Sequence, residues 1–362
     1  MAIDIYSTYY MLNAVQEKPI EYSFLRDRYF TTGGADIFAA PQVLVDYKDR
    51  EEHYLAPFVS ERYGGVPYKR TGFETHLLEP GHVSVSRPLT ADELQNRQLG
   101  EAIFSTRTPA ERARLLLMQD MDDLDALISR REEAMCAETM LTNAIDMSYL
   151  VDDTSKEKVE RIVHYYDVNT EESNPTALTP AAKWDTDDGD WKEDVGNAAQ
   201  ALADDGRPVS DLIVSPGIAS VILKDTEIMK LLDNRRMEIG EIDPRWQNNG
   251  VTYLGRLNFG GFDISIFAYR GTYIDPDTGA VTRFIPDGCA ILTAPGCGVL
   301  KYGAVTQMDY GFTEFRTYAG RRVPKLDVDT THNARTLTLT SKPLTAPVLK
   351  NPWYSFHDCL SA

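Results

Sequence analysis

Two acidic runs have residue types and spacing that could bind a metal ion. In Asp275-Pro276-Asp277 the carboxylates alternate, as they do in loops that hold Ca²⁺ through oxygen ligands. The segment lacks the further ligands and the terminal glutamate of a calcium loop, so a tight turn is favoured. The second run, at positions 185 to 190, precedes a predicted helix, where carboxylates complement the helix dipole. We therefore interpret the first run as a turn and the second as a solvated helix cap.

The residue types that serve as nucleophiles, bases and metal ligands are otherwise scattered. The six histidines show neither H-E-x-x-H nor paired spacing, and the four cysteines have no C-x-x-C spacing. The sequence has no G-x-x-x-x-G-K-S/T phosphate loop and no G-x-G-x-x-G dinucleotide motif. It predicts no catalytic residue, no cofactor and no metal site, hence a protein that is not an enzyme, with its cysteines as reduced thiols.

The charge balance disfavours sequence-specific binding of nucleic acid. Lys and Arg total 37 against 55 Asp and Glu, a formal net charge of −18. Phosphate binding depends on clustered Lys and Arg, although an acidic wall could still enclose nucleic acid without gripping it. The N-terminal residues lack a signal-peptide pattern, and no segment approaches the ~20 apolar residues of a membrane span. We expect synthesis in a cytoplasm and no membrane contact, which argues against a secreted carbohydrate-active enzyme.

One long amphipathic helix is predicted from 109 to 143. Thr108-Pro109-Ala110-Glu111 is a capping box with proline at the first helical position. Apolar residues then recur at three-, four- and seven-residue steps, at Leu117, Met121, Leu124, Ile128 and Met135. The charged residues around this stripe, Glu132 and Glu133 among them, are expected to face water or partners. The steps fail to hold a strict heptad past Ile128, which disfavours a coiled coil.

The segments before and after this helix predict an extended region and a compact α/β lobe. Short β-like runs lie at Gln42–Tyr47, Leu55–Val59, Gly72–Leu78 and His82–Ser86, with Gly and Pro turns between them. They indicate a long, thin β-hairpin that projects from the body. Further along, we expect helices at Trp191–Ala203, after Ser215-Pro216 and at Thr226–Asn234, a strand at Asp211–Val214, and a hairpin from Phe262 to Ile285 turning at Asp275–Gly279.

Short strings occur in one order along nearly the whole chain, and the principal ones are Phe24-Leu25-Arg26, Phe30-Thr31-Thr32, Leu55 to Ser60, Arg112 to Met121, Lys230 to Arg236, Tyr269 to Tyr273 and Phe284 to Asp287. Taken together, they resemble the major capsid proteins of tailed bacteriophages, specifically the phage lambda-like group. The resemblance implies an α+β chain with the Hong Kong 97-like capsid fold. It also implies an N-terminal arm (1–34), an extended β-hairpin loop opening the peripheral domain (35–105), the peripheral domain with its spine helix at 109–143 (106–193), an axial α/β domain (194–300), and C-terminal strands completing the peripheral domain (301–362).

The resemblance further implies the function of a major head protein. Such a chain self-assembles into homo-hexamers and homo-pentamers of an icosahedral shell that encloses double-stranded DNA without reading its sequence. Its expected partners are copies of itself, a separate scaffold protein and a portal, and the resemblance leaves open whether a decoration protein also binds. Its expected place is the capsid of the virion, after synthesis as a late protein in the bacterial host cytoplasm. The alternatives are an encapsulin-type compartment shell and another phage structural protein.

Exposed apolar residues of the arm and the hairpin are the candidate intersubunit contacts. In the hairpin these are Tyr54, Leu55, Phe58 and Phe73, and in the arm Phe24 and Phe30. Because neither segment can bury these side chains within itself, we expect them to pack elsewhere, the arm aromatics either on the lobe of the same chain or on an adjacent subunit.

Overall fold

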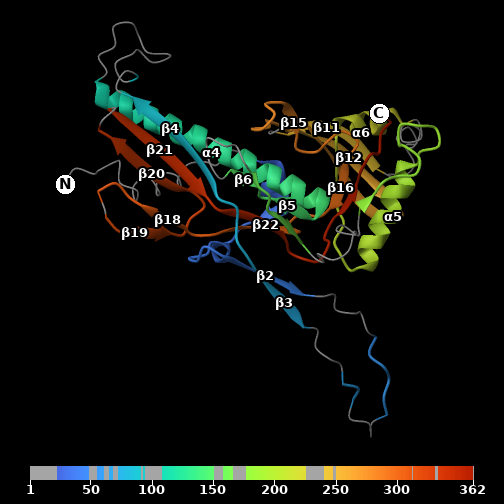
Figure 1. The fold of residues 1–362 in the computed structure, drawn as a ribbon. Coiled ribbons are helices and arrows are strands. Elements are labelled where there is room, and N and C mark those ends of the chain that lie inside the picture. Colours follow the sequence, from blue (N-terminus) through green and yellow to red (C-terminus); the bar gives the residue numbers. More distant parts are fainter. Residues whose placement is uncertain are drawn as a thin grey trace.

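The computed structural model describes residues 23–48, 55–60, 65–67, 72–90, 93, 108–150, 158–165, 177–225, 240–247, 250–311, 313–330 and 333–361. The long helix α4 runs from a three-stranded sheet at one end of the molecule to a larger sheet with helices at the other (Figure 1). A thin hairpin leaves the body between these two ends. The mixture of a few helices with many strands confirms the predicted α+β class.

Helix α4 (Pro109–Thr142) begins where the sequence predicted. The Thr108 hydroxyl accepts the Glu111 N–H, the Glu111 carboxylate accepts the Thr108 N–H, and Asn143 ends the helix in the left-handed conformation. All five residues of the predicted apolar stripe are buried. The stripe's first part, from Leu117 to Ile128, packs on the sheet of β4 (Val83–Thr90), β21 (Ala334–Ser341) and β20 (Val323–Asp329).

A seven-stranded sheet forms the core of the opposite end. Its order is β11 (Gly240–Gln247), β12 (Val251–Phe259), β13 (Phe262–Tyr269), β10 (Asp211–Val214), β16 (Ala290–Thr293), β23 (Tyr354–Phe356) and β9 (Ala177–Leu178). Every residue of the central strand β10 is buried. Strands β9 and β23 come from outside 194–300, so this sheet recruits segments that the sequence assigned to the neighbouring domain.

Helices α5 (Trp191–Asp204) and α6 (Pro216–Lys224), both predicted from the sequence, cover one face of this sheet. Asp190 caps α5 by accepting the N–H groups of Lys192 and Glu193, which confirms the cap interpretation for that residue. Ser215 does not cap α6 with its side chain; its hydroxyl instead accepts the Gly288 N–H at 3.2 Å. The helix predicted at 226–234 lies outside the described residues.

The other face of the sheet packs on the last part of α4, the helix α2 (Phe24–Tyr29) and a small sheet. That small sheet has the order β1 (Phe30–Thr31), β17 (Gly298–Tyr302) and β22 (Pro343–Pro347). Strand β1 runs parallel to β17. The arm from Ser23 to Thr31 is therefore folded into the body of its own chain, next to the short 3-10 turn η1 (Gly34–Asp36).

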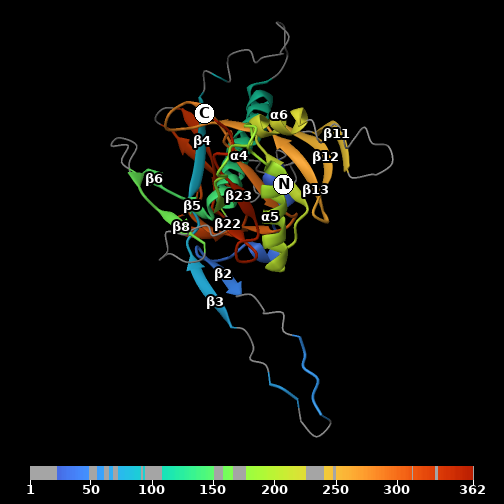
Figure 2. The same cartoon turned by 90° about the vertical axis from the view of Figure 1, so that its right-hand side faces the viewer.

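The projecting hairpin consists of β2 (Val43–Lys48) and β3 (Phe73–Leu78), paired antiparallel from Val43–Leu78 to Lys48–Phe73. It points away from the body in both views, which confirms the predicted projection (Figures 1 and 2). Leu55–Ser60 lie far from the body but form no strand, so the strand predicted at Leu55–Val59 is wrong. Its apolar composition favours a strand, but these six residues pair with no other strand among the described residues.

Four short two-stranded sheets complete the described structure: β5 (Ala144–Asp146) with β8 (Ile162–His164), β6 (Tyr149–Leu150) with β7 (Lys158–Val159), β14 (Thr272–Ile274) with β15 (Val281–Arg283), and β18 (Val305–Met308) with β19 (Phe315–Tyr318). The predicted turn at Asp275–Gly279 joins β14 to β15, but Phe262–Phe267 pairs with β12 and β10 instead. The Asp275 carboxylate accepts the Asp277 N–H and the Thr278 hydroxyl, as a tight turn requires. None of the helices described is long and apolar enough to cross a membrane.

Candidate functional site

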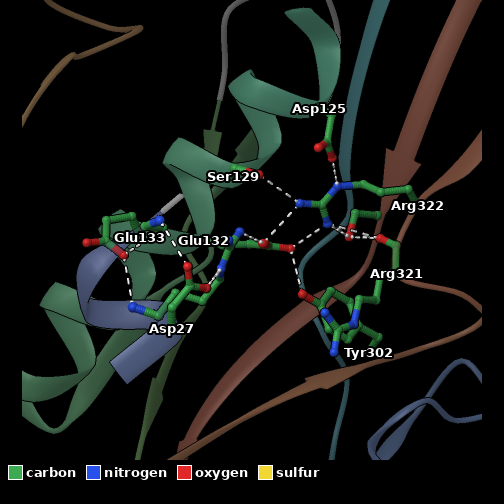
Figure 3. Close-up of polar contacts among 11 residues, drawn as sticks. Asp27, Asp125, Ser129, Glu132, Glu133, Tyr302, Arg321 and Arg322 are labelled. Atoms are coloured by element: carbon green, nitrogen blue, oxygen red, sulfur yellow. Dashed lines mark hydrogen bonds and ion pairs between the residues drawn. The ribbon is translucent and has the colours of Figure 1, made fainter. Parts of the chain in front are cut away.

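Glu132 and Glu133 of α4 are buried, with side chains exposed by 0% and 2%, and the expectation that they face water or partners is wrong. Consecutive helical residues point about 100° apart, so the two carboxylates reach different neighbours. Glu132 faces the end of β17 and the start of β20, and Glu133 faces the arm. Both carboxylates are hydrogen-bonded within the chain, and that of Glu132 is also paired with guanidinium groups (Figure 3).

Glu132 is the centre of an ion network. Arg322 donates to both of its carboxylate oxygens, at 2.6 and 3.0 Å. Arg26 of the arm donates to the same carboxylate at 3.1 Å, and the Tyr302 hydroxyl donates at 3.0 Å. A planar guanidinium bound through two parallel hydrogen bonds is the strongest geometry available to such a pair. One side chain of α4 thus joins the arm, β17 and the residue before β20.

Arg322 extends the network along α4. Its Nε lies 2.5 Å from the Asp125 carboxylate, and its Nη2 lies 3.2 Å from the Ser129 hydroxyl. Asp125, Ser129 and Glu132 follow one another at four- and three-residue steps, so they share one face of the helix. The guanidinium therefore lies along two helical turns, and every nitrogen of this buried group has a partner.

The electrostatics keep the network ionised. Burial alone would raise the pKa of Glu132, but the facing guanidinium groups of Arg322 and Arg26 hold that pKa below its ordinary value. Burial and the Glu132 charge raise the pKa of Tyr302, so its hydroxyl keeps the proton that it donates. A buried, fully hydrogen-bonded pair of this kind contributes little when compared with apolar residues, but removing one partner costs several kcal/mol, on the order of 3 to 5.

Glu133 caps the arm helix α2 from a distance of more than 100 residues along the chain. Its carboxylate accepts the N–H groups of Leu25 at 2.9 Å and Arg26 at 3.0 Å, as well as the Ser23 hydroxyl. Tyr269 donates to it at 2.6 Å. A six-residue helix is too short to be stable alone in water. The helical conformation of the arm therefore depends on Glu133.

Further contacts hold the arm against the central strand of the large sheet. The Asp211 carboxylate on β10 accepts Arg28 Nε at 2.7 Å and the Tyr29 hydroxyl at 3.0 Å. Phe24 packs on Phe267, with ring centroids 5.5 Å apart. The arm, α4 and the seven-stranded sheet thus form one interlocked unit, which we call the arm clamp: Ser23–Thr31 with Glu132, Glu133, Asp211, Tyr302 and Arg322.

The structure separates the six predicted contact residues. Phe24 and Phe30 are 5% and 3% exposed in the core of their own chain, so of the two alternatives for these arm aromatics, packing on the same chain holds. Leu55 and Phe58 are almost fully exposed on the hairpin. Phe73 opens β3 opposite Lys48, and Tyr54 lies outside the described residues. The arm and the hairpin therefore do not meet in one site.

Within the described residues no group of three or more acidic, histidine or cysteine side chains could hold a metal ion. All four cysteines are free and buried. Burial raises the pKa of the Cys359 thiol to about 12. The arm, α4 and the sheets therefore hold one another in place, and a hairpin with exposed apolar side chains projects from them.

Comparison with known proteins gives one consistent result. A model of the family described as phage major capsid protein E matches residues 7–356. The chain is 24% identical to the major capsid protein of Enterobacteria phage phi80 over 316 residues, covering 85% of this chain and 86% of that protein. It is 23% identical to the major capsid protein of Escherichia phage lambda over 295 residues, covering 80% of each.

Two solved structures share the fold. The first is the candidate capsid protein of an Escherichia coli prophage, with a TM-score of 0.64 and 16% identity, covering 96% of this chain and 98% of that one. The second is a phage-related protein of Bordetella bronchiseptica, with a TM-score of 0.51 and 11% identity, covering 97% of each chain. The fold is thus retained across most of both chains despite low sequence identity.

Proposed function

This chain belongs to the phage major capsid protein E family and is a major capsid protein of a tailed phage with a Hong Kong 97-like fold, and from that premise we propose that it builds an icosahedral shell of hexamers and pentamers. The family is structural, and we propose no enzymatic activity. Its members form the shell of the virion. The match favours this role over an encapsulin compartment or another phage structural protein.

The observation that carries the assembly proposal is the projecting hairpin. Leu55 is 92% exposed and Phe58 is fully exposed, and both follow β2 along the chain in the projecting loop. Burying one such side chain is worth roughly 1.5 to 3 kcal/mol, so leaving both in water is costly unless a partner covers them. The occupant we propose is an adjacent copy of this chain, which would gain the same contact in turn from its own neighbour.

The arm clamp has a supporting part in this proposal. It joins the long helix, the arm, the seven-stranded sheet and the sheet of β1, β17 and β22 into one body. The hairpin projects from this body. We also propose the domain limits predicted from the sequence, namely arm, extended loop, peripheral domain, axial domain and C-terminal strands, with β9 and β23 added to the axial sheet.

The remaining partners that we propose are the enclosed DNA, a scaffold protein and a portal. A net charge of −18 suits a wall that encloses double-stranded DNA without binding its phosphates tightly. We propose that a separate scaffold protein guides assembly and that a portal occupies one vertex. We propose synthesis in the bacterial host cytoplasm.

Assembly of the purified chain tests the function directly. The protein is produced alone and together with a candidate scaffold, and its mass is measured by light scattering beside negative-stain microscopy. Closed shells, tubes or capsomer-sized rings are expected. A clean monomer under both conditions, at low and at high salt, would contradict the proposal.

A further inference from the structure

Both legs of the projecting hairpin meet the body at one short connection. This connection, Gly303-Ala304, lies between β17 and β18. On the entry leg, the Ala304 N–H donates to the Ala40 carbonyl at 2.9 Å. A Cβ at position 303 would lie 3.0 Å from the Pro41 carbonyl oxygen on this leg and 2.7 Å from Pro80 Cγ on the exit leg. No side chain fits between the two legs.

Close approach, not backbone conformation, accounts for the glycine. Gly303 is not among the glycines with positive φ, so alanine could adopt its backbone angles. The atoms that a Cβ would meet can yield little, because one belongs to the backbone and the other to a small proline ring, which can move its Cγ only by a change of pucker. Substitution at this position must therefore move a leg of the hairpin.

Other contacts fix the same root. Lys301 Nζ donates to the Leu44 carbonyl at 2.8 Å on the entry leg, and Arg161 Nη2 donates to the Glu79 carbonyl at 2.8 Å on the exit leg. Val43 and Val45 point into the core beneath. Leu77, in contrast, is 57% exposed, and Leu55 farther along is 92% exposed. The hairpin is thus held at its base and is free of the body farther out.

We propose that Gly303 is a positioning residue that sets the direction in which β2 and β3 leave the body. Through that direction it determines where Leu55 and Phe58 meet the next subunit, a step that rests on the proposed function. A Cβ at position 303 would lie 2.7 Å from Pro80 Cγ, and an ordinary van der Waals contact between them requires a shift of ~0.9 Å. Across two strands ~4.8 Å apart, this shift corresponds to a tilt of the hairpin by ~10°. Over the six residues of β2, ~20 Å at ~3.3 Å each, that tilt displaces the far end by ~3.5 Å.

Distances between spin labels in the unassembled full-length chain test this directly. Labels are placed at Leu55→Cys or Leu77→Cys, each paired with Leu127→Cys on the exposed side of α4. The four native cysteines are buried and should not react. Gly303→Ala is expected to move the Leu55 distance by ~3 Å or more and the Leu77 distance by less, as for a lever turning at its root. Unchanged distances for both pairs would overturn the proposal.

Two further variants separate positioning from a general defect. Gly72→Ala is the matched control, because this glycine lies beside the same hairpin with open space around its added Cβ, and its distances should stay at the wild-type values. Pro80→Ala removes the atom at 2.7 Å, so it should move the Gly303→Ala distances back toward wild type. If Gly303→Ala fails to fold, Pro80→Ala alone should broaden the Leu55 distance distribution by opening the root, and an unchanged width would contradict the proposal.

Assembly then distinguishes this inference from the proposed function. If wild type and Gly72→Ala form shells of one size, Gly303→Ala should form shells of altered size or open sheets. Adding Pro80→Ala to Gly303→Ala should return the unfolding midpoint to the wild-type value. Wild-type-sized shells at wild-type yield from a tilted Gly303→Ala hairpin would overturn the second step. A wild type that never assembles would contradict the proposed function, while the label distances would still decide the role of Gly303.

Discussion

Glu132 and Arg322, 190 residues apart in the chain, form a bidentate ion pair whose nitrogen–oxygen distances are 2.6 and 3.0 Å and whose side chains are 0% and 4% exposed. The pair lies where the long helix, the arm and the strand β20 converge. Burial strengthens each hydrogen bond and also raises the cost of an unpaired charge. The pair therefore makes the stability of the body depend on contacts between distant segments.

Truncation of one partner should be far more damaging than replacement of both. Arg322→Met leaves the Glu132 and Asp125 carboxylates buried with less compensation, so we expect a loss of about 3 to 5 kcal/mol in the free energy of unfolding. Urea denaturation with a constant m-value measures it. Glu132→Met combined with Arg322→Met should lose less than the sum of the two single losses, because the two sites share one interaction. Additive losses would show that the pair is not coupled.

The same pair predicts a loss of stability in acid. The folded-state pKa of Glu132 is lowered, so its contribution is complete above the ordinary glutamate pKa of ~4.3 and is lost as the pH falls through the lowered value. Unfolding free energies measured from pH 7 down to pH 3 should fall most steeply below ~4.3. Glu132→Gln, which cannot titrate, should show a shallower fall in this range. Parallel curves for the two proteins would contradict this assignment.

Release of the arm is the expected effect of losing the Glu133 carboxylate. Glu133→Ala removes the acceptor of the Leu25 and Arg26 N–H groups, and loss of such a cap costs about 0.5 to 2 kcal/mol. Hydrogen exchange of residues 24–31 should accelerate while exchange in the seven-stranded sheet stays slow. Arg131→Ala, at an exposed position two residues before Glu133, is the control and should leave the arm protected. Equal exchange in all three proteins would show that Glu133 does not hold the arm.

Signals that are local in the sequence predicted the elements correctly. The capping box at Thr108 and the spacing from Leu117 to Ile128 were enough to place α4, because both act within one or two turns. The same pattern held a clue to the site. After Ile128 the next position of the stripe is Glu132, so a carboxylate stands where an apolar residue is expected. A charge at a core position indicates a buried partner.

The identity of that partner could not be predicted from the sequence. Arg322 and Arg26 lie 190 and 106 residues from Glu132, and no periodicity links them. The failed strand at Leu55–Val59 has a related cause, since a strand needs a ladder partner that local composition does not specify. Likewise, the aromatics of the arm were known to need a partner, but only the fold shows that Phe24 and Phe30 use their own chain.

Charge at the far part of the hairpin should prevent assembly without unfolding the subunit. Leu55→Glu with Phe58→Glu changes two side chains that are almost fully exposed, so the free energy of unfolding should stay within about 0.5 kcal/mol of wild type. Burying either carboxylate against a neighbouring copy would be strongly unfavourable, so closed shells should disappear from micrographs and the mass by light scattering should fall to that of free subunits. Leu55→Met with Phe58→Leu keeps both residues apolar and should assemble. Normal shells from the doubly charged variant would show that these residues remain in water in the shell, and the intersubunit contact would then have to lie elsewhere.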